Sequence, residues 1–241
     1  METEIVFGCS HIPFQNKKLL NGVLKLIEDI KPTGVSLIGD IFDMNAFSFH
    51  DRGQIPLMDI KTEYRLSEKY VNDIFLATRK VKHKRFLYGN HEDRYLRHLK
   101  VPDSKRIIIE PVEERFRFAE NGWQVKTDWK EDYYTLGEYL DIFHGELLGE
   151  HPAKRQLDKT KKSCMFVHSH RMQTYVDGKM ASYNIGGLFD KDAVVFRYAG
   201  RLTRSRWANG FAVVYIDNNG YYFVNPISCY NDSFIFNGKK Y

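Results

Sequence analysis

The sequence predicts an α/β fold in which two β-sheets pack face to face and helices cover the outside. In the first half of the chain, short apolar runs alternate with stretches of helical periodicity, a pattern typical of βαβ units and a largely parallel sheet. In the second half, short apolar runs separated by turn residues indicate further strands. No repeat, low-complexity tract or obvious linker divides the 241 residues. We therefore expect a single domain over residues 1–241.

The first half is expected to form three strands and two helices. In the first helix, apolar side chains share one face, Asn16 can cap the start and Pro32 can end it. The second helix has an apolar stripe of the same kind. The expected elements are a strand at 4–8, a helix at 16–31, a strand at 34–39, a helix from about Leu57 to Val81 and a strand at 85–89.

The second half contains five further apolar runs, each short enough for a strand. They occupy residues 139–143, 163–167, 181–185, 211–216 and 221–227. The last two flank DNNG at 217–220, where Asn and Gly tolerate the positive φ of a tight hairpin turn. We therefore expect a hairpin there.

The composition is that of an ordinary folded protein. Hydrophobic residues make up 43% and charged residues 28% of the chain, which excludes the disordered class. The net charge of +5 is compatible with a polyanionic partner but is too small for this length to require one. No apolar run approaches the roughly 18 residues of a membrane span. Three widely spaced cysteines, Cys9, Cys164 and Cys229, imply no disulfide framework. We expect a cytoplasmic protein without a membrane partner.

Metal-ligating side chains directly follow five of the expected strands. They are Cys9 and His11 after IVFG, Asp40 and Asp43 after VSLIG, Asn90, His91 and Glu92 after RFLYG, His144 after LDIF, and His168 and His170 after CMFV. Each alone is compatible with an ordinary turn or a lone histidine. Together they would meet where the carboxyl ends of the strands point. Such a cluster would bury uncompensated polar groups unless cations paired them, so we expect a pair of metal ions.

In this order and spacing, the segments CSH, GDIFD, GNHE, HGE and HSHR resemble the signature of the calcineurin-like metallophosphoesterases, which runs DxH, GDxxD, GNH(D/E), H and GHxH. The resemblance covers residues 5–187, and GNHE and HSH are its specific parts. It implies a four-layer fold, a two-sheet β-sandwich flanked by helices. It also implies a metal-dependent phosphoric ester hydrolase.

The resemblance assigns a role to each of these side chains. The implied ligands of the first ion are Cys9, His11, Asp40 and His170, and those of the second ion are the bridging Asp40 with Asn90, His144 and His168. His91 takes the role of the acid that faces the leaving-group oxygen. Asp43 and Glu92 are supports, and we expect Glu92 to orient His91 by a hydrogen bond.

The residue types suit that chemistry. Two divalent ions bind the phosphoryl oxygens, lower the pKa of a bridging water and clamp an in-line displacement. A carboxylate can give one oxygen to each ion, and neutral imidazoles add affinity without cancelling the positive charge. Protonated His91 would stabilise the departing alkoxide.

Cys9 departs from the family pattern, which has Asp at this position. A thiolate favours zinc or iron over manganese or magnesium. Cys9 can ligate a soft ion, stay an unbound buried thiol that leaves the site weak, or form a redox-sensitive position, and we favour ligation. The expected cofactors are two divalent ions drawn from manganese, iron and zinc.

The motifs do not distinguish a phosphatase from a phosphodiesterase, since the metal centre attacks phosphorus in both. The expected substrate contacts are Asn90, His91, Arg94, His50 and Arg52. An ordinary loop is an equal explanation for His50 and Arg52, and an exposed helix position is an equal explanation for Arg94.

Two alternative functions remain open. A nuclease would use Arg201, Arg204 and Arg206 beside Trp207 to follow a phosphate backbone, and its partner would be a nucleotide or nucleic acid. A binding scaffold would keep the fold and lose the activity, starting with the change at position 9. The oligomeric state is not predicted.

Overall fold

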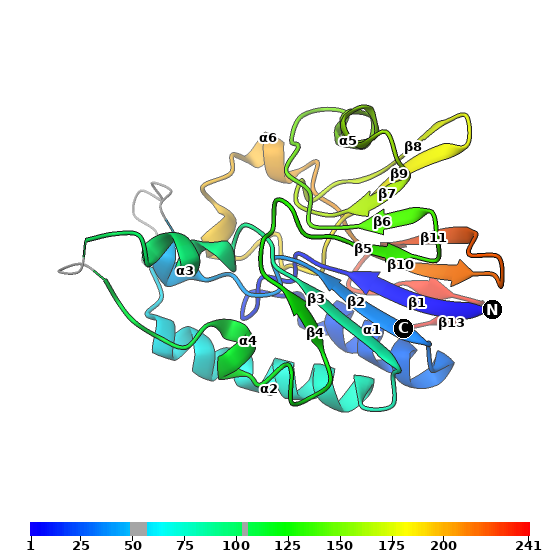
Figure 1. Cartoon of the computed structure of the whole chain (residues 1–241). Helices are drawn as coiled ribbons and strands as arrows, with labels where there is room; N and C mark the ends of the chain where they lie inside the picture. Colours follow the sequence, from blue (N-terminus) through cyan, green and yellow to red (C-terminus); the bar gives the residue numbers. More distant parts are fainter. Residues whose placement is uncertain (49–56, 103–105) are drawn as a thin grey trace.

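The computed structural model describes residues 1–48, 57–102 and 106–241, and in it two β-sheets face each other between outer layers of helix (Figure 1). The predicted α/β class with two packed sheets is confirmed. The expected arrangement of the first half is also found, because β1, β2, β3 and β4 pair in parallel with helices between the first three.

The first sheet has six strands in the order β11-β10-β1-β2-β3-β4. Their bounds are Tyr222–Cys229, Asn209–Ile216, Glu2–Phe7, Gly34–Ile38, His83–Leu87 and Gln124–Lys126. The predicted hairpin at 217–220 joins β10 to β11, with Ile216 opposite Tyr222. This hairpin extends the first sheet, because β10 pairs antiparallel with β1.

The second sheet has five strands in the order β5-β6-β7-β9-β8. Their bounds are Tyr134–Leu136, Leu140–Ile142, Cys164–Phe166, Met180–Ile185 and Met172–Asp177. The strands β6 and β7 run parallel, so their carboxyl ends lie at the same edge. A separate two-stranded sheet is formed by β12 (Ile235–Phe236) and β13 (Lys239–Lys240).

Helices α1 (Lys17–Ile30) and α2 (Ile60–Thr78) cover the outer face of the first sheet, and α5 (Pro152–Thr160) covers the second (Figure 1). The Asn16 side chain caps α1 by accepting from Leu19 N, as predicted. Asp59 caps α2 through Lys61 N and Thr62 N, so this helix begins later than expected. The remaining short helices are η1 (Asn45–Phe47), α3 (Asp93–His98), α4 (Val112–Arg115), η3 (Val194–Phe196) and α6 (Arg201–Arg204).

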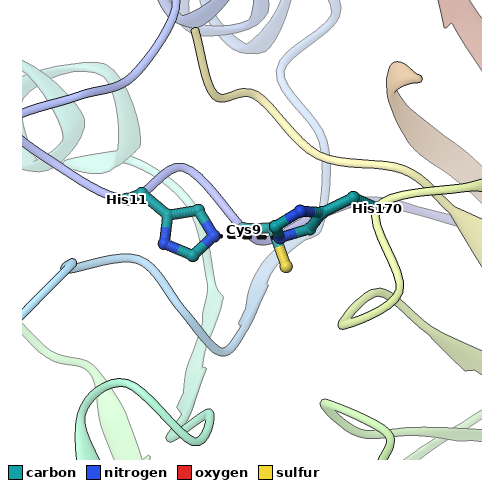
Figure 2. Close-up of side chains that lie close together, drawn as sticks. All are labelled: Cys9, His11 and His170. Carbon is teal, nitrogen blue, oxygen red and sulfur yellow. Dashed lines mark hydrogen bonds between the residues drawn. The ribbon is translucent and has the colours of Figure 1, made fainter. Parts of the chain in front are cut away.

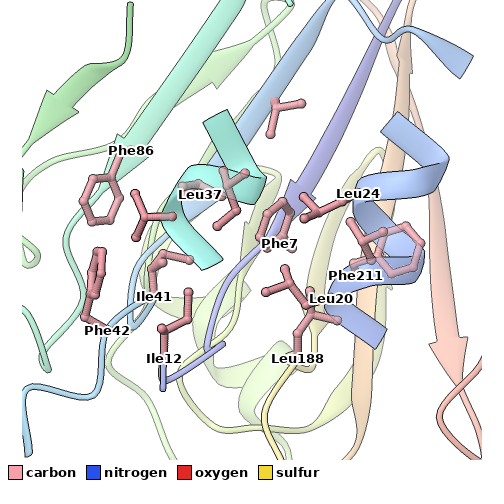
Figure 3. Packing of buried hydrophobic residues seen from close by; sticks show 14 of the residues in the cluster. Phe7, Ile12, Leu20, Leu24, Leu37, Ile41, Phe42, Phe86, Leu188 and Phe211 are labelled. Carbon is pink, nitrogen blue, oxygen red and sulfur yellow. The ribbon is translucent and has the colours of Figure 1, made fainter. Parts of the chain in front are cut away.

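Strand β1 shows how the layers are held together, since successive side chains of a strand point to opposite faces. Ile5 and Phe7 pack with α1 side chains such as Leu20 and Leu24 in the larger core (Figure 3). Val6 points the other way, into the core between the two sheets. The first sheet is therefore buried on both faces, which explains its continuous apolar runs.

None of the helices described in residues 1–48, 57–102 and 106–241 is both long enough and apolar enough to cross a membrane.

Candidate metal centre

The side chains that were expected to meet do so at the carboxyl ends of five strands. The loops after β1, β2 and β3 of the first sheet and after β6 and β7 of the second converge on one place between the sheets. They bring together Cys9, His11, Asp40, Asp43, Asn90, His91, Glu92, His144, His168 and His170, most of them buried. Residues more than 150 positions apart in the chain thus become neighbours, as the contact between His11 and His170 shows.

Five of the expected ligands have a left-handed backbone, which non-glycine residues rarely adopt. The φ values are 44° for Cys9, 50° for His11, 51° for Asp40, 44° for His168 and 56° for His170. Each such residue costs about 1–3 kcal/mol and persists only where its surroundings hold it, and such residues cluster at functional sites. Part of the fixing is visible in backbone hydrogen bonds, from Cys9 N to Gly39 O at 2.9 Å and from His11 N to Asp40 O at 3.0 Å.

One group of ligand atoms surrounds His144 Nε2. Asn90 Oδ1 lies 3.0 Å from this nitrogen, His168 Nδ1 lies 3.2 Å away and Asp40 Oδ2 lies 3.3 Å away. These are the four side chains expected to hold the second ion. The first sheet supplies Asp40 and Asn90, and the second sheet supplies His144 and His168.

The tautomer of His144 makes this group a good cation site. Its Nδ1 lies 3.1 Å from the carbonyl oxygen of Ile38, which can only accept, so Nδ1 carries the proton. In the neutral ring, Nε2 then presents a lone pair to the Asp40 carboxylate and to the Asn90 oxygen. Such a concentration of acceptors is compensated by a bound cation, or by a second proton on His144. Burial lowers the pKa of His144, but Asp40 and Glu92 outweigh it and raise that pKa overall.

A second group consists of Cys9, His11 and His170 (Figure 2). Each offers one ligand atom, and these atoms lie within 4.8 Å of one another. His11 Nε2 and His170 Nε2 are 3.0 Å apart. The Cys9 thiol, Asp40 and His144 also form a close set, so Cys9 lies between the two groups. This buried set of nitrogen, oxygen and sulfur donors could hold a divalent metal ion, and a thiol among the donors favours the softer ions, zinc and iron.

Asp43 orients two histidines at once. Its Oδ1 lies 3.2 Å from His11 Nδ1 and 3.1 Å from His91 Nδ1, while its Oδ2 accepts from Asn45 Nδ2 at 3.1 Å. Burial would raise the pKa of Asp43, but the hydrogen bonds from His11 and His91 hold it well below its usual value. The carboxylate therefore keeps the proton of His11 on Nδ1 and turns the Nε2 lone pair toward His170.

His91 is held as a neutral ring by Asp43 and Arg94. His91 Nδ1 lies 2.8 Å from the Asp43 carbonyl oxygen and so donates, while Nε2 accepts from Arg94 Nη2 at 2.8 Å, because a guanidinium can only donate. Burial and the nearby Arg94 lower the pKa of His91 to about 4. The expected protonated donor is thus a neutral acceptor in this arrangement.

Glu92 does not have the role that the sequence suggested. Its hydrogen bonds go to backbone N–H groups: Oε1 accepts from Phe42, and Oε2 accepts from Asp40 and Gly89, at 2.8–2.9 Å. The bonds that orient His91 come from Asp43 instead. Glu92 therefore ties the loop after β2 to the loop after β3, and it positions Asp40 rather than His91.

A hollow of about 300 Å³ opens onto the centre. Asp40, Asn90, His91 and His168 line its floor, and Tyr198 and Trp207 line part of its wall. Its lining includes the hydrogen-bonding side chains of Asn90 and Arg94.

The remaining residues expected to contact a substrate or a nucleic acid differ in their surroundings. Arg94 lines this hollow although it is only 2% exposed, so the alternative of an exposed helix position is wrong. Arg201 and Arg206 are exposed, whereas Arg204 donates to the carbonyl oxygens of Ala199 and Lys191. His50 and Arg52 lie outside the described residues.

No protein-family model matches the sequence, and no curated protein matches it. In structure, the chain is similar to Vacuolar Protein Sorting 29 from Cryptosporidium parvum, with a TM-score of 0.50 and 14% identity over 100% of this chain and 94% of that chain. For a single mutant of Vps29 from Entamoeba histolytica, the TM-score is 0.48 and the sequence identity is 10%, over 99% of this chain and 96% of that chain. For YfcE, a phosphoesterase from E. coli, the TM-score is 0.47 and the sequence identity is 13%, over 97% of each chain.

The likeness to the Cryptosporidium parvum protein shows a shared fold. It is the two-sheet α/β arrangement flanked by helices that the sequence predicted.

Proposed function

We propose that the protein is a metal-dependent phosphoesterase that hydrolyses phosphomonoester or phosphodiester bonds at a centre of two divalent ions, drawn from zinc, iron and manganese. The observation that carries the proposal is the position of Asp40. One oxygen of this carboxylate lies in the ligand group around His144 Nε2, and Asp40 also lies in a close set with His11 and His91. A carboxylate shared between two adjoining ligand groups is the arrangement that a pair of ions requires.

The protein supplies binding and positioning. The bound ions would lower the pKa of a bridging water and bind the phosphoryl oxygens. Asn90 and Arg94 face the same hollow and can donate to a phosphate oxygen. Glu92 and Asp43 keep Asp40 and His11 in their ligating positions through the hydrogen bonds described above.

His91 needs a rearrangement before it can act as an acid. To donate to a leaving-group oxygen, its Nε2 must carry a proton, and two N–H groups cannot face each other at the 2.8 Å that separates Nε2 from Arg94 Nη2. Arg94 must therefore turn away. A phosphate in the hollow provides the reason, because it attracts the guanidinium and favours the protonated ring. Arg94 would thus couple substrate binding to the protonation of His91.

The test is hydrolysis of bis(p-nitrophenyl) phosphate and p-nitrophenyl phosphate by metal-stripped protein after addition of zinc, iron or manganese. His168→Ala removes a ligand, and we expect hydrolysis to be lost. His91→Ala should lower kcat by roughly 10²–10⁴-fold, the range of a positioned acid. The exposed His151→Ala is the matched control. Equal kcat for His91→Ala and His151→Ala would contradict the role of His91, and inactivity with every metal and both esters would refute the proposal.

A nuclease is the second candidate, and the wall of the hollow favours it. Tyr198 and Trp207 line this wall, and exposed Arg201 and Arg206 lie on the same segment. Arginines beside aromatic rings suit a single-stranded nucleic acid. Cleavage of an oligonucleotide, with binding that weakens steeply as salt rises, would support a nuclease. Trp207 packs edge-on against His170 at 4.6 Å between ring centroids, so it contacts an expected metal ligand and also lines the hollow.

A further inference from the structure

A second hollow, of about 280 Å³, lies beside the candidate metal centre. Trp129, Tyr133, Phe143 and Gln156 are among its lining residues, and the two hollows share none of their lining. Trp129 connects it to the centre, since its ring centroid lies 6.1 Å from that of His144 and 6.3 Å from that of His168 (rings tilted by 73° and 34°).

The walls suit a flat ring. Trp129, Tyr133 and Phe143 contribute aromatic surfaces, and the hollow presents more apolar than polar surface. The Phe143 ring is itself held in place by stacking on Phe166, at 6.4 Å between centroids and 10° between planes. Aromatic walls bind planar heterocycles by stacking.

The charged residues at the rim do not favour an anion. Lys159 donates to Glu146, and Lys162 Nζ lies 3.9 Å from Asp141 Oδ2. All four side chains line the hollow, so two of its lysines already have carboxylate partners there. A phosphate would have to displace these partners, whereas a neutral ligand leaves them in place.

Gln156 provides an acceptor without a donor. It lies on α5, is 3% exposed and lines the hollow. Its Oε1 is buried and has no hydrogen-bond partner among the residues that the structure describes. An unpaired buried carbonyl oxygen is costly, and the Gln156 side chain lines the hollow, so this amide can turn its oxygen toward a donor on a bound ligand.

We infer that this hollow binds a neutral, planar nitrogen heterocycle with an N–H donor, the chemistry that a nucleobase presents. The ring would lie among the aromatic walls and donate to Gln156 Oε1. Because Trp129 packs near His144 and His168, a base stacked on it would lie near the ligands of the second ion. This last consequence rests on the proposed phosphoesterase function, and it would make nucleotides the substrate class. The binding of the base does not rest on it.

The experiment measures adenosine binding to the whole protein in the presence of a chelator, by calorimetry and by quenching of tryptophan fluorescence. We expect adenosine to bind and ribose, which lacks the base, not to bind. Gln156→Met removes the acceptor at nearly constant length and should weaken binding roughly fivefold, the effect of one hydrogen bond. Gln124→Met, at an exposed position of β4, is the matched control.

A second variant, outside α5, keeps the test decisive if Gln156→Met fails to fold. Trp129→Leu removes the stacking surface and should weaken adenosine binding roughly tenfold, with a smaller quench. Absence of adenosine binding, or unchanged affinity in both Gln156→Met and Trp129→Leu, would overturn the inference and leave Gln156 to a buried water. Adenosine binding by a protein that hydrolyses no phosphoester would refute the proposed function and keep the base site.

Discussion

Replacing Asp43 by Asn tests the idea that one buried carboxylate prepares both a metal ligand and the candidate acid. Oδ1 of Asp43 lies close to the Nδ1 atoms of His11 and His91, both of which donate, and Oδ2 accepts from Asn45. An amide has one oxygen and one NH₂ group. In either orientation of the amide, its NH₂ must face donors, either the two imidazoles or Asn45. The loss therefore exceeds that of a negative charge alone.

The expected size follows from the role of Asp43. Residues that orient metal-ligating histidines change metal affinity by about 10–100-fold when they are replaced. At about 1.36 kcal/mol per factor of ten, this is roughly 1.4–2.7 kcal/mol of binding free energy. The loss of metal affinity should arise at His11, the expected ligand that Asp43 orients. Activity should fall in addition, because the substitution removes the negative charge beside His91 Nδ1 and leaves that atom only the Asp43 backbone carbonyl as acceptor.

Titration calorimetry with zinc on metal-stripped protein measures the first effect, and hydrolysis at saturating zinc measures the second. Asp158→Asn is the control, since Asp158 is an exposed helix residue paired with Lys154. The free energy of unfolding in chelator shows whether both variants remain folded. A zinc affinity of Asp43→Asn within twofold of that of Asp158→Asn would refute the reasoning.

Three further predictions concern other parts of the chain. Gly34→Ala should lower the free energy of unfolding in urea by about 1–3 kcal/mol, because the new Cβ would lie 1.7 Å from Glu4 Oε2. The control Gly200→Ala should leave it unchanged, because no atom lies within 4 Å of the new Cβ. Equal stabilities of the two variants would contradict this. Burial, only partly opposed by Arg85, raises the pKa of Glu4 to about 7. Folded Glu4 then keeps a proton that the unfolded chain loses above pH 4.5, so the contribution of Glu4 to stability is fully present below that pH and is lost as pH rises toward 7. From pH 5 to 8 we expect a loss of roughly 2–3 kcal/mol that is absent in Glu4→Gln; parallel pH profiles would disprove it. Cys9→Asp should retain zinc less tightly relative to manganese than the native protein, and an unchanged ratio would show that the thiol does not ligate.

The convergence of the expected ligand side chains could be predicted from the sequence for a simple reason. Parallel strands bring their carboxyl ends to one edge, so residues just after each apolar run must meet there. Asp40, Asn90 and His168 illustrate this, because each follows a buried strand of the first or second sheet. The strands β4, β5, β8, β12 and β13 were not predicted. In β4 and β5, three residues with partly exposed side chains leave little periodicity to detect.

The hydrogen bonds that support these ligands could not be predicted in the same way. Glu92 directly follows His91, and this proximity suggested that it would orient the imidazole. The direction in which a turn sends a side chain depends on its φ and ψ, and the left-handed backbones at the strand ends are not encoded by glycine. The structure sends the Glu92 carboxylate to backbone N–H groups and assigns His91 to Asp43. The same limit applies to Gln156, whose unpaired oxygen depends on how α5 packs against the second sheet.

The two ligand groups differ in the protons that they must release to bind a cation. Burial lowers the pKa of His168 to about 3 and that of His170 well below its usual value, so both are neutral ligands at pH 7. Burial and Asp40 raise the pKa of Cys9 well above that of a free thiol, so Cys9 must lose a proton when it ligates. His144, with its raised pKa, releases its proton in the native protein and in Cys9→Asp alike. The zinc affinity of the native protein should therefore rise with pH about tenfold per unit more steeply than that of Cys9→Asp, because one additional proton leaves with the thiol. Parallel pH dependences in calorimetric titrations would mean that zinc binds without the thiolate, and His11, Asp40 and His170 would then hold the ion alone.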